Sequence, residues 1–341
     1  MSPLADGFGR PLRNLRLSVT DRCNLRCSYC MPEEHYVWLP KPNVLSFEEI
    51  VRCVDAFLAL GVDELRLTGG EPLLRTDLPV LVRMLAQRPG LKDLAMTSNG
   101  VLLREHAAAL RAAGLQRLTV SLDTLDAATF RQLSRRDDLP RVLAGLEAAR
   151  AAGFADVKID TVVIAGVNDG ELPALLDFAR GIGAELRFIE YMDVGGATNW
   201  SPRHVVSRAQ MLALLRASHG PIRELPRTDS APAERFELRD GTRFGIIASV
   251  TKPFCATCDR SRLTADGMWF TCLYAAHGTD LRELLRTGAD DAALRARLTE
   301  VWQGRRDRGA EVRAALPDRR ALAEAASLRQ NPHLEMHTRG G

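Results

Sequence analysis

The sequence predicts an α/β fold in which six strand–helix units form a partial parallel barrel, followed by a C-terminal extension. Two observations indicate this fold. Short apolar runs alternate with amphipathic helical patterns, and a glycine closely follows each of the first four helical patterns, as is typical of helix C-termini. Six units are fewer than the eight of a closed barrel, so we expect a TIM-like (β/α)6 barrel that is open at one side.

The predicted elements alternate along the first part of the chain. We expect strands at 15–19, 64–68, 93–97, 117–122, 157–163 and 185–191, and helices at 47–60, 78–87, 104–113, 139–152 and 171–182. Beyond residue 191 we expect a loop, a helix at 207–217, a Pro-rich connection at 221–232 and a hairpin of strands 235–238 and 242–247 around Asp240-Gly241. At 341 residues, the chain therefore divides into a barrel domain, 1–220, and a C-terminal domain, 221–341.

The loop after the first strand carries three cysteines with the spacing C-x3-C-x2-C, namely Cys23, Cys27 and Cys30 (the N-terminal triad). Three thiolates from one loop can hold three irons of a cubane and leave the fourth iron open to a ligand. A structural zinc site would need a fourth ligand, and the nearest histidine, His35, lies beyond Pro32. Zinc and scattered buried thiols are the alternatives, and the spacing favours the open-iron cluster.

Other unusual residues also stand where predicted strands end. The stretch Gly69-Gly70-Glu71-Pro72 follows the second strand, Thr97 and Ser121 end the third and fourth, and Met192 follows the sixth. Loops after the strands of such a barrel share one rim, so we expect these residues to lie close together. The two glycines allow a backbone to approach a ligand closely.

A second set of three cysteines lies in the extension: Cys255, Cys258 and Cys272 (the C-terminal triad). Spacing alone leaves both zinc and an iron–sulfur cluster open, although a closed zinc site would need His277 or a distant fourth ligand. Arg260 and Arg262 stand between these thiols. Beside a cluster they would hold a substrate with phosphates; the alternative is a solvated strand edge.

Composition limits the class of protein. The formal net charge is only +3, which gives no argument for a nucleic-acid surface. No 18-residue apolar run and no signal-peptide pattern is present, so we expect a cytoplasmic protein without a membrane span. Six of the seven cysteines form the two triads, which in a reducing compartment indicates metal rather than disulfides; Cys53 reads as a buried apolar residue.

The N-terminal triad, with Tyr29 and Met31-Pro32, resembles the signature of radical S-adenosylmethionine (SAM) enzymes, and the Gly-Gly-Glu-Pro stretch resembles their GGEP motif. The segment C-x2-C-D-R-S-R-L-T-A-D-G-x4-C and the terminal Gly340-Gly341 resemble the GTP 3',8-cyclase family. This resemblance covers essentially the whole chain.

The resemblance implies a set of roles. Each triad would bind one 4Fe-4S cluster, and SAM would be contacted by Tyr29, Gly70, Ser121 and Met192. GTP would be held by Arg16, Arg66, Thr97, Lys158, Arg260, Ser261 and Arg262. Among these, Cys23, Cys27, Cys30, Arg260 and Arg262 would serve catalysis most directly. Outward, solvated positions are the alternative for Arg16, Arg66 and Lys158. The chain departs from the family at Asp259 and Asp160, where Asn is expected, and we expect Asp160 to lie beside a cation or to point away.

The implied reaction is radical cyclisation of GTP to (8S)-3',8-cyclo-7,8-dihydroguanosine 5'-triphosphate, the first step of molybdenum cofactor biosynthesis. A 5'-deoxyadenosyl radical would take hydrogen from C3' of the ribose. Expected partners are a one-electron reductase or flavodoxin-like donor, the downstream cyclic pyranopterin monophosphate synthase, and a second copy in a homodimer. The diglycine end would insert toward the active site. Alternatives are another twin-cluster radical SAM enzyme acting on a peptide or other substrate, and an electron carrier or zinc-dependent binding module.

Overall fold

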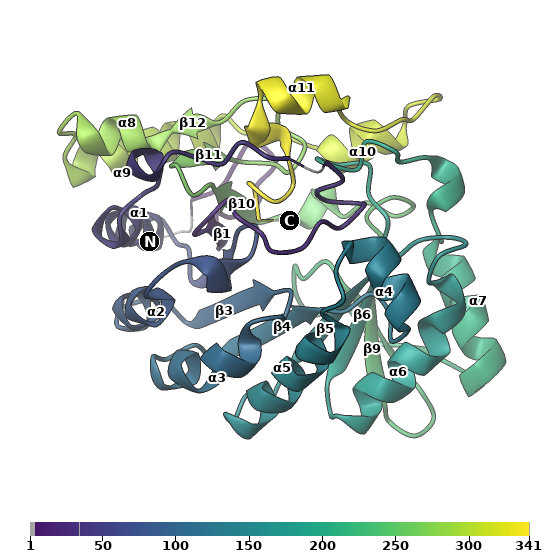
Figure 1. Cartoon of the computed structure of the whole chain (residues 1–341). Helices are drawn as coiled ribbons and strands as arrows, with labels where there is room; N and C mark the ends of the chain where they lie inside the picture. The colour runs from purple at the N-terminus through teal and green to yellow at the C-terminus, as the bar shows by residue number, and fades with distance from the viewer. Residues whose placement is uncertain (1–3, 34, 341) are drawn as a thin grey trace.

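The computed structural model describes residues 4–33 and 35–340, and its backbone is organised around one twelve-stranded sheet. The strand order is β12-β11-β10-β1-β2-β3-β4-β5-β6-β9-β8-β7. Its central strands are β1 (Asn14–Ser18), β2 (Glu64–Thr68), β3 (Asp93–Ser98), β4 (Arg117–Ser121), β5 (Lys158–Val163) and β6 (Glu185–Glu190), all parallel. The sheet curves into an open barrel (Figure 1). The predicted partial barrel is confirmed.

Helices cover the outer face of the central strands (Figure 1). They are α1 (Phe47–Ala59), α2 (Leu78–Ala86), α3 (Leu103–Ala112), α5 (Leu139–Ala151), α6 (Leu172–Gly181) and α7 (Arg208–His219). Helix α4 (Ala127–Ser134) instead lies at the rim, where its carbonyls accept bonds from the backbone N of Arg26 and of Ser28 in the cysteine loop. Local signals set their starts: Ser46 forms a capping box with Glu49 at the start of α1, and Ser207 forms one with Gln210 at the start of α7.

Side-chain alternation explains why the inner face of the barrel is polar. In β1, Leu15 and Leu17 are fully buried against the helices, whereas Arg16 between them points to the other face. Successive side chains of a strand point to opposite faces, so one strand supplies both the apolar core and a cavity-lining cation. The same alternation occurs in β2, where Arg66 separates Leu65 from Leu67.

The extension lengthens the same sheet at both edges. Strand β10 (Arg260–Leu263) pairs in parallel with β1, and β9 (Arg243–Ile247) pairs in parallel with β6. Strands β11 (Met268–Phe270), β12 (Thr279–Asp280), β8 (Glu234–Glu237) and β7 (Arg223–Glu224) continue it with antiparallel pairs. Hydrogen bonding of the sheet therefore runs across the predicted domain boundary at 220/221.

Two of the C-terminal helices, α10 (Gly309–Ala314) and α11 (Ala325–Gln330), lie above the open mouth of the barrel (Figure 1). The other two, α8 (Leu281–Arg286) and α9 (Asp291–Gln303), pack against α1 at one edge of the molecule. Among the described residues, no helix is both long and apolar enough to cross a bilayer.

The six predicted strands and five predicted barrel helices are confirmed to within about two residues at each end, as is the hairpin around Asp240-Gly241. The sequence patterns did not predict α4, strands β10–β12 or helices α8–α11, and the expected connection 221–232 contains the short strand β7. The sequence does contain an N-cap residue for α4, Asp126, whose Oδ1 accepts a bond from the backbone N of Thr129 in the structure. In α9, Leu294, Leu298 and Trp302 repeat every four residues and form its buried stripe.

Candidate functional site

Both triads line one cavity. It has a volume of about 520 Å³ and runs through the inside of the barrel to the carboxyl ends of the strands, where the loops after β1, β2, β4 and β6 meet residues of the extension. All six triad cysteines border it. The expectation that residues after the strands share one rim is therefore met, and the two triads, more than 220 residues apart in sequence, share one chamber.

The N-terminal triad lies in a buried, carboxylate-bearing environment. Burial raises the pKa of Cys23 to about 11, with a further contribution from Glu71. The pKa of Cys27 is raised well above its ordinary value by burial and then by Cys23, Asp123 and Cys30. Three neighbouring thiols that resist ionisation together become good ligands only when a cation joins them, which fits a cluster site.

Residues from neighbouring strands hold this loop in place. The hydroxyl of Tyr29 donates to Oδ2 of Asp123 at 2.5 Å, and Nδ2 of Asn99 lies 3.8 Å from Sγ of Cys23. Burial raises the pKa of Asp123 to about 6, although the bonds from Tyr29 and from the backbone N of Val162 oppose this. Tyr29 is thereby fixed against the wall of the cavity.

The Gly-Gly-Glu-Pro stretch crosses the cluster loop at close range. Gly69 has φ +141°, and a Cβ there would lie 2.3 Å from the carbonyl oxygen of Thr20; one on Gly70 would lie 2.2 Å from that of Arg22. Only glycine permits this approach. Glu71 is fully buried and accepts bonds from Ser98 Oγ and the backbone N of Asn99, while burial raises its pKa to about 7.

The C-terminal triad differs in having arginines beside one of its thiols, although burial raises the pKa values of Cys255 and Cys272. Burial disfavours the Cys258 thiolate, but Arg260 and Arg305 outweigh it and lower the pKa of Cys258 to about 7. Nη2 of Arg260 lies 3.7 Å from Sγ of Cys258, and the backbone N of Tyr274 donates to Sγ of Cys272 at 3.4 Å. Donors aimed at the sulfur atoms suit thiolate ligands of a cluster.

Over residues 4–33 and 35–340, no three His, Cys, Asp or Glu side chains converge as ligands of a single metal ion. The ligands of a cubane stand farther apart than those of one ion, because each thiolate binds a different iron. Both triads therefore offer the donor type that a 4Fe-4S cluster uses, with three ligands each.

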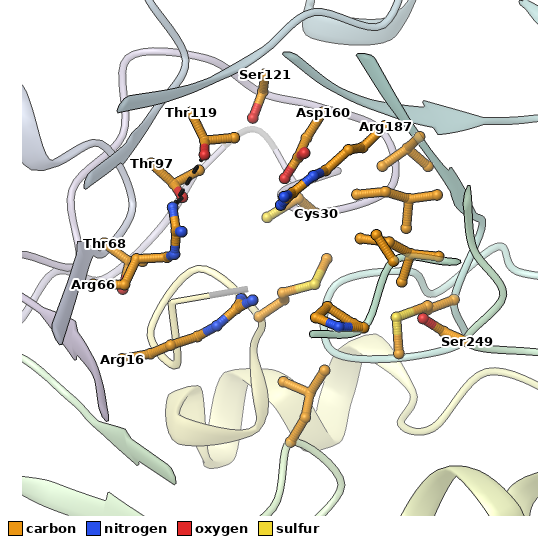
Figure 2. Close-up of a pocket in the computed structure, with 18 of the residues that line it drawn as sticks. Arg16, Cys30, Arg66, Thr68, Thr97, Thr119, Ser121, Asp160, Arg187 and Ser249 are labelled. Carbon is orange, nitrogen blue, oxygen red and sulfur yellow. Dashed lines mark hydrogen bonds between the residues drawn. The ribbon is translucent and has the colours of Figure 1, made fainter. Parts of the chain in front are cut away.

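Four cations from four strands form the basic wall of the cavity: Arg16, Arg66, Lys158 and Arg262. Figure 2 shows Arg16 and Arg66 projecting into the cavity, with Arg187 opposite, and the bonds from Arg66 Nη1 to the hydroxyls of Thr97 and Thr119 at 3.2 and 3.1 Å. The solvated alternative for Arg16, Arg66 and Lys158 is wrong, because all three side chains line the cavity.

Burial and mutual repulsion disfavour these charges. The pKa of Arg16 is lowered well below its ordinary value by burial and then by Arg262, Arg260 and Arg66. Burial, followed by the charge of Arg187, lowers the pKa of Lys158 to about 8. A polyanion bound in the cavity would relieve both effects.

The two departures from the family pattern have separate surroundings. Asp160 lines the cavity beside Arg187, its register partner on β6 (Figure 2), as expected for a carboxylate near cations. Its Oδ1 is buried and has no hydrogen-bond partner among the described residues. Asp259 accepts a bond from Oγ of Ser230 at 2.6 Å.

The C-terminal tail enters the same cavity. The carbonyl oxygen of Gly340 accepts from Nη1 of Arg262 at 2.7 Å and from Nη1 of Arg16 at 3.3 Å. Gly340 has φ +63°, and a Cβ there would lie 1.9 Å from Oγ1 of Thr68. Gly341, the other half of the predicted diglycine end, lies outside the described residues.

Nearly every residue implied by the resemblance borders the cavity, including Tyr29, Gly70, Thr97, Ser121 and Met192. Ser261 is the exception: it pairs in register with Leu15, is fully buried, and is not part of the cavity lining. The lining also contains residues that sequence reasoning missed, namely Thr119, Asp123, Arg187, Tyr274, Met336 and His337. Arg187 had a usable signal, since it alternates with apolar residues in β6.

Similar folds occur among solved structures. The crystal structure of Streptococcus suis SuiB has a TM-score of 0.60 and 15% identity, and the alignment covers 84% of this chain and 68% of that one. The SAM-bound SuiB structure has a TM-score of 0.59 at 16% identity, with 84% and 67% covered. At this identity the likeness shows the fold.

Family models and relatives in sequence identify the family as well as the fold. Residues 17–179 match the radical SAM superfamily, and residues 184–311 match "Molybdenum Cofactor Synthesis C". GTP 3',8-cyclase 3 of Mycobacterium bovis is 55% identical over 100% of this chain and 91% of its own length. The Acidothermus cellulolyticus enzyme is 52% identical over 92% and 89%, and that of Xanthomonas campestris pv. campestris is 46% identical over 95% and 96%. The chain therefore belongs to the GTP 3',8-cyclase family of radical SAM enzymes.

Proposed function

We propose that this protein uses SAM and two 4Fe-4S clusters to cyclise GTP to (8S)-3',8-cyclo-7,8-dihydroguanosine 5'-triphosphate, the first step of molybdenum cofactor biosynthesis. One observation carries the proposal: the basic wall stands in the same 520 Å³ cavity as both cysteine triads. An electron carrier or a zinc-binding module would have no use for buried cations whose charges repel one another, whereas a triphosphate neutralises them.

On the N-terminal side, Cys23, Cys27 and Cys30 hold the cluster that binds SAM. When bound, the reduced cluster and SAM supply the 5'-deoxyadenosyl radical. SAM would be positioned by Tyr29, Gly70, Ser121 and Met192. The two glycines let their backbone lie against the cluster loop, where its polar groups would meet the amino group, and Tyr29, held by Asp123, would lie beside the adenine.

On the C-terminal side, Cys255, Cys258 and Cys272 would hold the second cluster, and its iron without a protein ligand would supply a binding position for the guanine base. The triphosphate is bound by Arg16, Arg66, Lys158, Arg260 and Arg262. The bond from Arg66 to the hydroxyl of Thr97 orients that hydroxyl toward the ribose. Ser261 contributes through its backbone, since its side chain faces away from the cavity. This holds C3' of the ribose toward the radical and excludes water.

Further proposals concern the cellular setting. We assign the protein to the cytoplasm, with a one-electron reductase or flavodoxin-like donor, a homodimeric state, and delivery of the product to a cyclic pyranopterin monophosphate synthase. Residues 1–220 act as the SAM domain and 221–341 as the substrate domain, joined through the shared sheet.

An anaerobic incubation with GTP, SAM and dithionite tests the function directly. We expect 5'-deoxyadenosine and a cyclised nucleotide to form together in equal amounts. Cleavage of SAM that is unaffected by GTP, with GTP recovered intact, would contradict the proposal and would leave the SAM site assignment standing.

A further inference from the structure

A buried ion triad lies directly behind the C-terminal cysteine triad. Asp6, Arg10 and Arg305 have side chains at most 3% exposed. Nε of Arg10 donates to Oδ2 of Asp6 at 2.6 Å, and Nη1 of Arg305 lies 3.4 Å from the same oxygen. Desolvating three charges is costly, so such a triad persists where its members have other bonds to make.

Those other bonds reach the cysteine backbone. Nη1 of Arg10 donates to the carbonyl of Cys255 at 2.8 Å, and Nη1 of Arg305 donates to the carbonyl of Cys258 at 2.9 Å. Nη1 of Arg10 also donates to the carbonyl of Asp307 at 2.8 Å. Both cysteines of the C-x2-C turn are thus held from behind by guanidinium groups.

The third cysteine, Cys272, is connected to the same three charged residues. The carboxylate of Asp307 accepts a bond from the hydroxyl of Thr271, the residue before Cys272, and lies 3.7 Å from Nε of Arg305. The indole Nε1 of Trp302 donates to the carbonyl of Arg10 at 3.2 Å, and the Arg305 guanidinium lies 4.5 Å from the Trp302 ring centroid. The N-terminal segment, the turn and α9 are therefore locked together around one charged centre.

Asp6, Arg10 and Arg305 together carry an excess of one positive charge, which the partly exposed carboxylate of Asp307 balances only in part. Arg305 brings its charge to the backbone of Cys258, a cluster ligand, at 2.9 Å. A buried charge is poorly screened by salt, so it acts on any electron added at this site. Positive charge stabilises the reduced, more negative form of a cluster.

We propose that Asp6, Arg10 and Arg305 are positioning residues for the C-terminal 4Fe-4S cluster: they fix its ligand loop against the cavity, and Arg305 sets its midpoint potential. The inference rests on the proposed function only in that this triad of cysteines carries a cluster. None of the three side chains lines the substrate cavity, so their effect on the reaction is indirect.

Redox titration of full-length protein tests this, in a background where Cys23, Cys27 and Cys30 are replaced by Ala so that only the C-terminal cluster reports. Arg305→Gln keeps an amide donor for the Cys258 carbonyl but removes the charge. We expect the ratio of reduced to oxidised cluster at a fixed potential to fall at least ten-fold. For a one-electron couple this is a decrease of about 59 mV in the midpoint potential. Arg305→Lys keeps the charge, and we expect its midpoint potential to stay close to that of the parent.

Two further variants make the result decisive. Arg306→Gln removes the same charge one residue along, where the side chain is exposed, and we expect no shift. Asp6→Asn removes the negative member, and we expect a shift of opposite sign, toward easier reduction. This variant decides the matter even if Arg305→Gln loses its iron.

An Arg305→Gln protein that keeps its iron and titrates like its parent would overturn the inference, as would equal shifts in Arg305→Gln and Arg306→Gln or no positive shift in Asp6→Asn. The titration uses neither GTP nor turnover, so such a result leaves the cyclase proposal intact. Absence of iron from the parent background would instead contradict the cluster assignment itself.

Discussion

The two cysteine triads contain the same number of thiols but differ in the charges that stand beside them. Around the N-terminal triad, burial and neighbouring carboxylates raise thiol pKa values, to about 11 for Cys23. In the C-terminal triad, burial also raises the pKa values of Cys255 and Cys272, but at Cys258 the charges of Arg260 and Arg305 outweigh burial and lower the pKa to about 7. A site rich in negative charge favours giving up an electron, whereas a site rich in arginine favours binding an anion. The difference fits electron transfer to SAM at one side and nucleotide binding at the other.

The largest effect should follow removal of a ligand from either side. Cys27→Ala removes one of three thiolates of the N-terminal site, so we expect SAM cleavage to be abolished and the iron content to fall from about eight to about four per chain. Iron analysis and 5'-deoxyadenosine assays measure both.

The matched change on the other side is Cys258→Ala. We expect it to halve the iron in the same way but to leave reductive cleavage of SAM measurable, while cyclisation is lost. If Cys258→Ala abolished SAM cleavage as completely as Cys27→Ala does, the division of labour between the triads would be wrong.

The tail should have the next largest effect. In Gly340→Ala, the added Cβ would meet Thr68 Oγ1 at 1.9 Å and the residue would keep an unfavourable φ of +63°, so the tail must leave Arg262. We expect cyclisation to fall at least ten-fold with SAM binding retained, as measured by product formation and equilibrium dialysis.

Gly241→Ala is the control for the tail variant, because that hairpin glycine also has a positive φ, +86°, but open space around its Cβ position. We expect it to behave like the parent in both assays. Full cyclisation by the Gly340→Ala protein would show that the tail is passive.

Removing one of the cations assigned to the triphosphate should cost less than removing a cluster ligand. A hydrogen bond to a charged group contributes about 1.5–3 kcal/mol, so we expect Arg262→Ala and Arg260→Ala to raise the KM for GTP roughly ten- to 100-fold. Reductive cleavage of SAM without GTP should stay near the parental rate.

The control for lost charge is Arg52→Ala, which removes a half-buried arginine on α1 that bonds Asp291 outside the cavity. Its KM for GTP should not change. An Arg260→Ala protein with the parental KM would remove that residue from the triphosphate site.

The smallest effect concerns protons. Lys158 has a pKa lowered to about 8 by burial and by Arg187, and a bound triphosphate would raise it again. Between pH 8 and the raised value, GTP binding should therefore take up close to one proton, and below that window the uptake should vanish because Lys158 is already charged. Calorimetry in buffers of different ionisation enthalpy measures it.

The Lys158→Met protein should lose this uptake. Uptake that persists in the variant would assign the proton to another group of the basic wall.

The same comparison shows what the sequence can and cannot reveal. The N-terminal site was predictable because its three ligands fall within eight residues and the strand ends that surround it follow a regular alternation. Arg16, Arg66 and Lys158 were identified through the family resemblance, whereas Arg187, which follows the same alternation, was missed. The direction in which Ser261 points depended on the register of β10 against β1, which local patterns do not encode.

The support of the C-terminal site was not predictable at all. Arg10 reaches Cys255 across 245 residues and Arg305 reaches Cys258 across 47, and neither belongs to a local motif. Strand β10 was missed for a related reason: its charged residues are typical of a solvated edge, and only the cavity makes them interior.

The central claim is that one cavity holds GTP with its ribose facing the radical generated at the N-terminal cluster. Incubating the reconstituted protein anaerobically with SAM, dithionite and GTP deuterated at C3' tests it most directly. The account predicts 5'-deoxyadenosine that carries one deuterium from the nucleotide, alongside the cyclised product. Unlabelled 5'-deoxyadenosine formed together with cyclised product would contradict it.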